Sequence, residues 1–270
     1  MNRIDRSGNS ISHRIISALR KQILAGKFRN DSKLPAERDL AEEFGVSQPT
    51  IREAISALDA MGLLDVRHGS GTYVNHNRMF IFATALQALL QLDAVTLAQA
   101  LDVRGMLGAH SVTLALEVAT AADIARIEEA LLRLEALGDL DSSEAVVQRM
   151  VDFQIAISET SRNPLLSMLE KLLIVLLLEV QMRAFRHRGV SYWKSRSMRF
   201  QSDRRRIVEA LKSRDSDATT RAMQGYFQHQ LDQFLRDPDL VKMRFSDEEV
   251  FKAVSEILVS LRKSGGPTME

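Results

Sequence analysis

The sequence predicts a mainly α-helical protein with one small β-hairpin near its N-terminus. Residues 10–61 hold three short amphipathic segments, and two β-prone runs follow them. Residues 79–263 show long stretches with the 3.6-residue period of helices. A chain of 270 residues is also long enough for two hydrophobic cores. We therefore expect a three-helix domain with a hairpin, followed by an all-α bundle.

The first three elements are short helices with recognisable ends. Segment 10–25 places Ile11, Ile15, Leu19 and Ile23 on one face, and Gly26 ends it. Segment 36–44 is expected to be a helix of two to three turns that ends at glycine. The third helix is expected to be capped by the Ser47 hydroxyl and to carry a proline in its first turn.

The hairpin is predicted from the segment LLDVRHGSGTYV, in which two β-prone runs flank a tip with two glycines. Three short helices followed by such a hairpin make a winged helix-turn-helix. In this fold the second helix of the motif enters the major groove of DNA.

Behind the hairpin the periodicity predicts only helices, and we expect no strand between residues 79 and 264. Leu172 to Leu178 is the most apolar stretch, too short to cross a bilayer, and is expected to be the middle of a core helix. The basic stretch 183–200 is expected to be a solvated loop, with contact to an anion or DNA left open. The expected helices are 79–92, 95–118, 121–137, 142–160, 164–187, 196–213, 215–235 and 246–263.

These elements suggest four parts. A DNA-binding winged helix-turn-helix takes residues 8–75, and residues 76–94 form a linker and first helix. A second, helical domain takes residues 95–236. Residues 237–270 form an extension with one helix and a disordered tail.

Composition excludes several classes of protein. The sequence contains no cysteine, which rules out disulfides, thiolate zinc sites and cysteine nucleophiles, and we expect a cytoplasmic protein with no membrane partner. Residues 1–10 lack the apolar core of a signal peptide. There is no phosphate-binding loop, nucleophile elbow or HExxH motif, so we expect no enzyme. The net charge of +1 gives no bulk signal for nucleic acid.

The candidate DNA-contacting residues lie in the second and third helices and the hairpin. Gln48 and Arg52 are four residues apart and share a helix face. Both side chains can make bidentate hydrogen bonds to bases, arginine with guanine and glutamine with adenine. Ser47 and Thr50 suit phosphate oxygens. The complete set is Arg38, Ser47, Gln48, Thr50, Arg52, Arg67, His68 and Gly69.

Residues 10–75 resemble the winged helix-turn-helix of GntR-type transcriptional regulators. The segment LPAERDLAEEFGVSQPTIREAISALDAMGLLDVRHGSGTYV carries the resemblance. It implies that Arg38, Gln48, Thr50, Arg52, His68 and Gly69 contact DNA. The FadR branch often has arginine where this chain has Gln48, so we expect either a changed base preference or the loss of one guanine contact, with DNA binding retained.

The rest of the chain resembles the FCD effector domain of the FadR branch. The matching segments are LDVRGMLGAHSVTLAL, FQIAISETSRNPLL and IVEALKSRDSDATTRAM. Many members of this branch bind a divalent metal through one aspartate and three histidines. The resemblance places Met150, Gln154, Arg204 and Tyr226 at those positions, so we expect no metal and no other cofactor. Arg104, Met150, Gln154, Arg204 and Tyr226 become candidate residues for an anionic effector. Simple packing of these side chains is the alternative.

We therefore expect a sequence-specific transcriptional regulator of a metabolic operon. Repression is the commoner mode in such regulators, and the sequence leaves activation open. The resemblance implies a homodimer that binds double-stranded DNA with inverted-repeat half-sites. The effector would be an organic acid, a sugar acid or an acyl-CoA. Two alternatives stay open: a DNA-binding protein without an effector, and a helical metalloenzyme. The sequence names neither the operator nor the effector.

Overall fold

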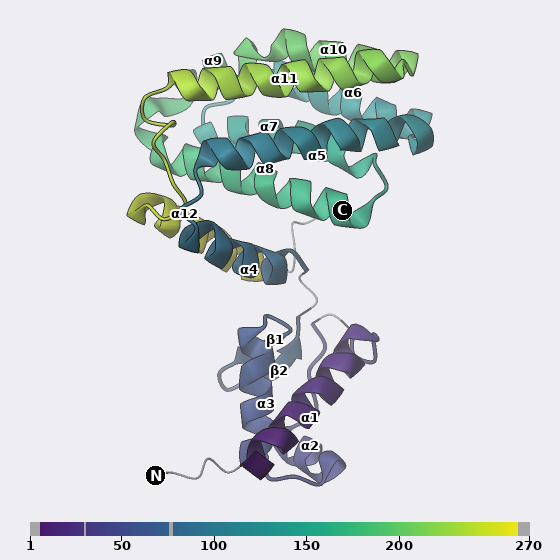
Figure 1. Ribbon diagram of the computed structural model, residues 1–270, viewed down its shortest axis with the longest axis vertical. Helices are drawn as coiled ribbons and strands as arrows, with labels where there is room; N and C mark the ends of the chain where they lie inside the picture. The colour runs from purple at the N-terminus through teal and green to yellow at the C-terminus, as the bar shows by residue number, and fades with distance from the viewer. Residues whose placement is uncertain (1–5, 30, 76–77, 264–270) are drawn as a thin grey trace. The chain divides into compact units, whose positions relative to one another are not determined.

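The computed structural model describes residues 6–29, 31–75 and 78–263, and it divides into two compact units. One contains residues 1–85 and 258–270, and the other contains residues 86–257. The described parts are a small helical domain with one hairpin and an all-helical bundle, as the sequence predicts (Figure 1). The tail expected to be disordered lies outside the described residues.

The small domain contains α1 (Arg6–Leu24), α2 (Glu37–Phe44) and α3 (Gln48–Ala60) around one apolar core. Leu19, Ile23, Leu40, Ile51 and Leu58 are almost completely buried in this core. Gly45 ends α2 in the left-handed region, at φ 64°, which glycine adopts without a Cβ clash. The turn between α2 and α3 is therefore as tight as a helix-turn-helix requires.

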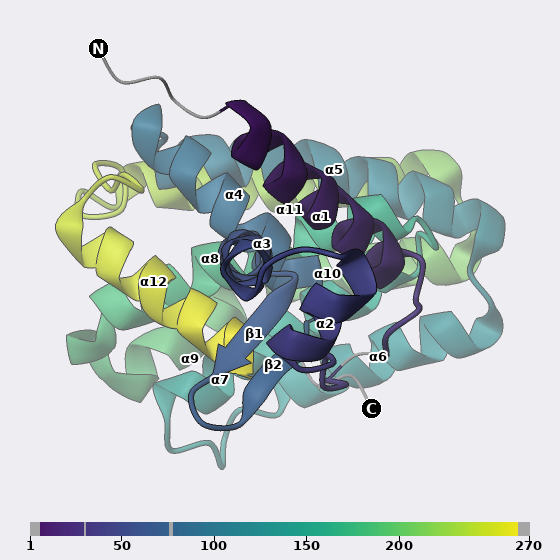
Figure 2. The same ribbon diagram turned by 90° about the horizontal axis from the view of Figure 1, so that it is seen from below.

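The hairpin consists of β1 (Leu64–Arg67) and β2 (Gly71–Val74), which pair antiparallel with Leu64 opposite Val74 (Figure 2). Leu64 and Val74 are buried at its base, whereas the strand ends near the tip are more exposed. One end of the hairpin thus packs against the helices and its tip is exposed to solvent.

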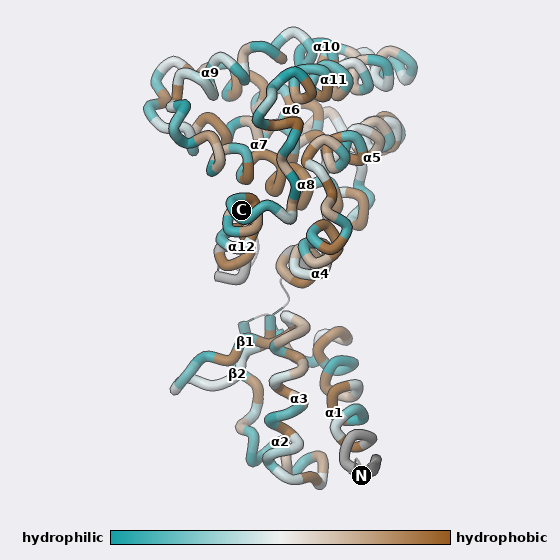
Figure 3. Tube along the Cα trace, turned by 60° about the vertical axis from the view of Figure 1, so that its left-hand side comes forward, coloured by the Kyte–Doolittle hydropathy of each residue, from teal (hydrophilic) through white to brown (hydrophobic). Residues whose placement is uncertain are grey.

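The bundle contains α5 (Leu97–Val118), α6 (Ala121–Glu135), α7 (Ser143–Glu159), α8 (Pro164–Ala184), α9 (Gly189–Arg199), α10 (Gln201–Ser213) and α11 (Ser216–Arg236). α11 packs along α5, and α7 packs along α8 (Figure 1). The expected core run Leu172 to Leu178 lies in α8, and almost all of it is buried. Figure 3 shows the hydrophobic residues of the bundle concentrated between its helices.

Side-chain caps fix where several of these helices begin. Thr96 and Thr120 each form a capping box, with Gln99 and Asp123 respectively. Asn163 accepts a hydrogen bond from the backbone of Leu166 just before Pro164. These caps explain why the predicted and observed starts of α5 to α8 differ by two residues at most.

Two local predictions were wrong. The stretch 183–200 is not a solvated loop: α9 takes residues 189–199, with Trp193 and Ser197 buried. The helix predicted over 196–213 is two helices, which meet at Phe200. The density of arginine hid an amphipathic helix, because Trp193, Ser197 and Phe200 occupy one face of it.

The last described helix is α12 (Glu248–Lys263), and α4 (Arg78–Leu92) precedes the bundle. The segment before α12 is bound to the start of α5: the Leu97 amide donates to the Met243 carbonyl, and the Phe245 amide donates to the Val95 carbonyl. Arg183 of α8 also pairs with Glu256 of α12. Residues 237–257 thus belong to the packing of their own bundle. None of the described helices is long and apolar enough to span a bilayer.

Candidate functional site

The start of α3 presents its polar side chains to solvent. Gln48 and Arg52 are both exposed on the same helix. Ser47 occupies the N-cap position, but its hydroxyl lies 2.9 Å from the Thr50 hydroxyl and does not cap the backbone. The predicted hydroxyl cap was therefore wrong. A free helix N-terminus carries partial positive charge, which favours a phosphate there.

Arg52 is held in place by a residue that the sequence analysis missed. Its Nε donates to Oε2 of Glu37 in α2 at 2.6 Å. No described residue accepts a hydrogen bond from either terminal nitrogen of Arg52, so both remain available to a base. Glu37 thus links the two helices of the motif and orients the arginine. The sequence gives little indication of this contact, because a single acidic residue is common in the first turn of a helix such as α2.

The hairpin residues divide into a fixed arginine and an open tip. Arg67 donates to Asp31 at 2.6 Å and to Asp65 at 2.9 Å, and its guanidinium lies 4.1 Å from the centre of the Tyr73 ring. Hydrogen bonds to Asp65 and then to Asp31 raise the pKa of Arg67 above its usual range. His68 and Gly69 are exposed at the tip, and Gly69 has φ 72°. Arg38 is exposed in α2, with Asp39 at 3.5 Å.

All five residues expected to contact an effector are buried in the bundle. The exposed fraction is at most 5% for each of Arg104, Met150, Gln154, Arg204 and Tyr226. Arg104, Met150 and Gln154 line one internal cavity of about 20 Å³, and Arg204 and Tyr226 do not. This volume suits one water molecule and is far below that of an organic acid.

Further polar side chains line this cavity, namely Gln181, Arg196 and Gln230. The sequence analysis missed them. Arg104 Nε, Gln154 Oε1 and Gln230 Nε2 have no hydrogen-bond partner among the described residues. Buried polar atoms without partners are costly, so these atoms are suited to bind a polar ligand.

Arg204 lies beside the cavity in a fixed position. Its Nη1 donates to the carbonyl and the hydroxyl of Ser197, at 2.8 and 3.2 Å. The guanidinium carbon lies 5.9 Å from the centre of the Tyr226 ring. No aspartate or glutamate in the described part of the chain forms an ion pair with Arg204.

Arg104 is the second buried cation. Its guanidinium lies 4.8 Å from the Phe227 ring, and burial lowers its pKa to about 10. Phe227 reaches this place because residue 108 is glycine: a Cβ there would lie 2.6 Å from the ring edge and 3.6 Å from Oε1 of Glu170. Glu170 is buried, and this burial raises its pKa. One cation, one acid and one aromatic ring therefore share the space beside Gly108.

The four positions at which the family resemblance implies metal ligands do not suit a metal in this chain. Thioether, amide and phenol groups with a guanidinium form a poor donor set, and the fixed charge of Arg204 repels a cation. Within the described ranges, no three His, Asp or Glu side chains gather in metal-binding geometry. His110 is exposed, and His229 Nδ1 lies 2.8 Å from Oδ2 of Asp203.

Comparison with known proteins places both domains. Residues 11–74 match the model for bacterial regulatory proteins of the gntR family, and residues 99–229 match the FCD domain. The HTH-type transcriptional regulator LutR of Bacillus subtilis is 34% identical over 189 residues, which cover 69% of this chain and 84% of the relative. The galactonate operon transcriptional repressor of Escherichia coli is 27% identical, with 77% and 90% covered. The solved structure of Streptococcus agalactiae GntR has the same fold, with a TM-score of 0.63, 22% identity and 82% and 99% of the two chains covered.

The buried acid makes the stability of the bundle depend on pH. Because the pKa of Glu170 is raised in the folded protein, its contribution is fully present below about pH 4, the ordinary range of a glutamic acid. That contribution is lost as the pH rises through the folded pKa. Glu170→Gln cannot ionise, so the free energy of unfolding of the variant minus that of the wild type should increase from pH 4 to pH 8. Urea unfolding at several pH values measures this difference; a decrease would mean that Arg104 lowers the pKa instead.

Proposed function

The chain belongs to the gntR family of bacterial regulatory proteins and carries an FCD domain, and from this premise we propose that it is an operon repressor released by an anionic small molecule. It is a DNA-binding transcriptional regulator and not an enzyme. Repression, dimerisation, the form of the operator and the identity of the effector are part of this proposal.

The proposed DNA contacts follow from exposure and chemistry. Gln48 and Arg52 lie on one face of α3 with free hydrogen-bonding atoms, and they are assigned to base edges in the major groove. Ser47, Thr50 and Arg38 are assigned to phosphates, and His68 and Gly69 at the hairpin tip to the neighbouring backbone or minor groove. Arg67 takes a lesser part, because two aspartates already bind it. The observation that carries this assignment is the hydrogen bond between Arg52 and Glu37, which holds the guanidinium in one orientation.

Operator geometry follows from symmetry. Two copies related by a twofold axis present two α3 helices, so the proposed operator is an inverted repeat with half-sites about one helical turn apart or a multiple of it. Repression is proposed because relatives over most of the chain, including the galactonate operon repressor, carry that name. An effector-independent DNA-binding protein is the competing proposal.

Selection of bound sequences from random duplexes tests the DNA contacts. Arg52→Ala should weaken operator binding by about 1–3 kcal/mol and relax one base pair in each half-site, because a bidentate arginine contact specifies that base. Arg20→Ala removes an exposed arginine of α1 in the same domain and should leave base preference unchanged. An equal loss of base preference in both variants, or a wild type that shows no preference among duplex sequences, would contradict the assignment.

The proposed effector is an organic or sugar acid. Arg104, Gln154, Met150 and Arg196 line the internal cavity, while Arg204 and Tyr226 contact Phe200, which also lines it. Two buried guanidinium groups without an ion-pair partner favour negative charge nearby. The cavity must widen to admit such a ligand. The ligand would therefore bind the widened conformation more tightly than the closed one and shift the equilibrium between them.

A pair of glutamate substitutions tests this assignment. A panel of galactonate, other sugar acids, dicarboxylates and acyl-CoAs should contain a compound that stabilises the protein in a thermal shift assay and weakens operator binding 5- to 150-fold, the usual range of allosteric coupling. Gln154→Glu places a negative charge at the cavity and should abolish this response. Gln148→Glu, exposed on the same helix, should preserve it. An equal response in both variants would exclude the cavity as the effector site.

A further inference from the structure

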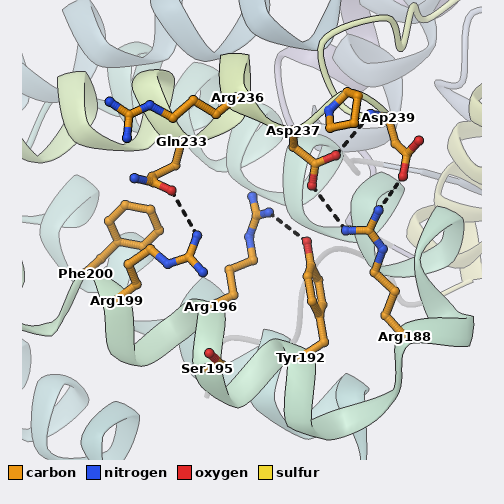
Figure 4. Close-up of a pocket in the computed structure, with 11 residues that line it drawn as sticks. Arg188, Tyr192, Ser195, Arg196, Arg199, Phe200, Gln233, Arg236, Asp237 and Asp239 are labelled. Carbon is orange, nitrogen blue, oxygen red and sulfur yellow. Dashed lines mark hydrogen bonds and ion pairs between the residues drawn. The ribbon is translucent and has the colours of Figure 1, made fainter.

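A second, larger pocket lies between α9 and the C-terminal end of α11 (Figure 4). Its volume is about 400 Å³, which is within the usual range for small-molecule sites. The charged residues that line it are Arg188, Arg196, Arg199, Arg236, Asp237 and Asp239.

The charges in this pocket are unbalanced. Arg188 binds both aspartates: Nη1 lies 3.1 Å from Oδ2 of Asp237, and Nη2 lies 2.5 Å from Oδ2 of Asp239. Among the described residues, Arg196, Arg199 and Arg236 have no ion-pair partner. Arg199 donates only to the amide oxygen of Gln233, at 2.9 Å. Three positive charges thus remain for a ligand, two of them on the same helix, α9.

Two side chains of this pocket also form the wall of the internal cavity. Arg196 and Phe200 line both spaces. Arg196 donates from Nη2 to Oε1 of the buried Gln181 at 2.6 Å and from Nη1 to the Tyr192 hydroxyl at 3.2 Å. A ligand that draws the guanidinium outward breaks the bond to Gln181. Binding in the outer pocket would therefore change the polar lining of the inner cavity.

We infer that this arginine pocket binds a small organic anion with two or more anionic oxygens, and that Arg196 couples its binding to the internal cavity. The forked guanidinium groups of Arg196 and Arg199 match the planar geometry of a carboxylate. The outer pocket has the volume of a whole ligand, whereas the internal cavity does not. The coupling rests on the proposed function; binding in the pocket does not.

The chain contains a built-in probe for this pocket. Trp193 is its one tryptophan, is fully buried in α9, and its ring lies 5.7 Å from the Arg196 guanidinium. Movement of Arg196 should therefore alter the tryptophan fluorescence of the full-length protein. Citrate and gluconate serve as anionic probes at constant ionic strength, and sorbitol serves as the neutral control.

Titration with citrate and gluconate should give a saturable fluorescence change for at least one of them and none with sorbitol. The double variant Arg199→Gln/Arg236→Gln should weaken binding roughly tenfold or more, because each charge-assisted hydrogen bond contributes appreciably. Arg133→Gln/Arg221→Gln changes the net charge equally at exposed positions outside the pocket and should bind as the wild type does. A wild type without saturable binding by fluorescence and calorimetry, or equal weakening in both double variants, would overturn the inference.

Arg196→Lys tests the coupling. It keeps a positive charge but cannot bridge Tyr192 and Gln181 with one planar group. Calorimetry should still show saturable but weaker probe binding, whereas at saturating probe the effect on operator affinity should be lost. An undiminished effect on operator affinity in this variant would overturn the coupling. Saturable pocket binding with no anion altering operator affinity would refute the proposed effector control and still support the anion site.

Discussion

Two guanidinium groups buried inside the helical bundle are the constraint on which the rest of this structure depends. Arg104 and Arg204 are each at most 5% exposed. An uncompensated buried charge is costly, so the surrounding residues must compensate it. For Arg204 this is done by the oxygens of Ser197 and the Tyr226 ring, and for Arg104 by the Phe227 ring.

This arrangement sets the charge of ligand that the proposed effector site would favour. Fixed positive charge beside a polar cavity raises the free energy of a bound cation and lowers that of an anion. Gly108 is part of the same arrangement, since any side chain there would displace the ring that covers Arg104. Arg104, the Phe227 ring and Gly108 thus fit together as one unit, in the same bundle as Arg204 and Tyr226.

Much of the fold follows from the sequence, because its signals are local. Four-residue spacing, capping threonines and terminal glycines define most of the helices to within two residues, and the two glycines of the hairpin define its tip. The prediction for residues 183–199 was wrong because five arginines lie in this stretch and give it the composition of an exposed loop. Their long side chains obscure the apolar face of α9 on which Trp193 is buried. A count of hydrophobic periodicity treats every position alike. Burial of one large tryptophan, however, favours an amphipathic helix more strongly than several exposed arginines oppose it.

The site was less predictable, because its contacts join residues far apart in the sequence. Exposure of Gln48 and Arg52 follows from helical spacing, but the orienting contact with Glu37 crosses a turn that a pattern does not measure. Likewise Arg104, Met150 and Gln154 meet at one cavity, while Gln181 and Arg196 join it from helices whose register no motif fixed. Metal analysis of the purified protein by mass spectrometry, after expression with zinc, nickel and manganese in the medium, tests the account most directly. We expect far less than one metal ion per chain, and a stoichiometric amount of any of the three would contradict the replacement of the metal site by buried arginine.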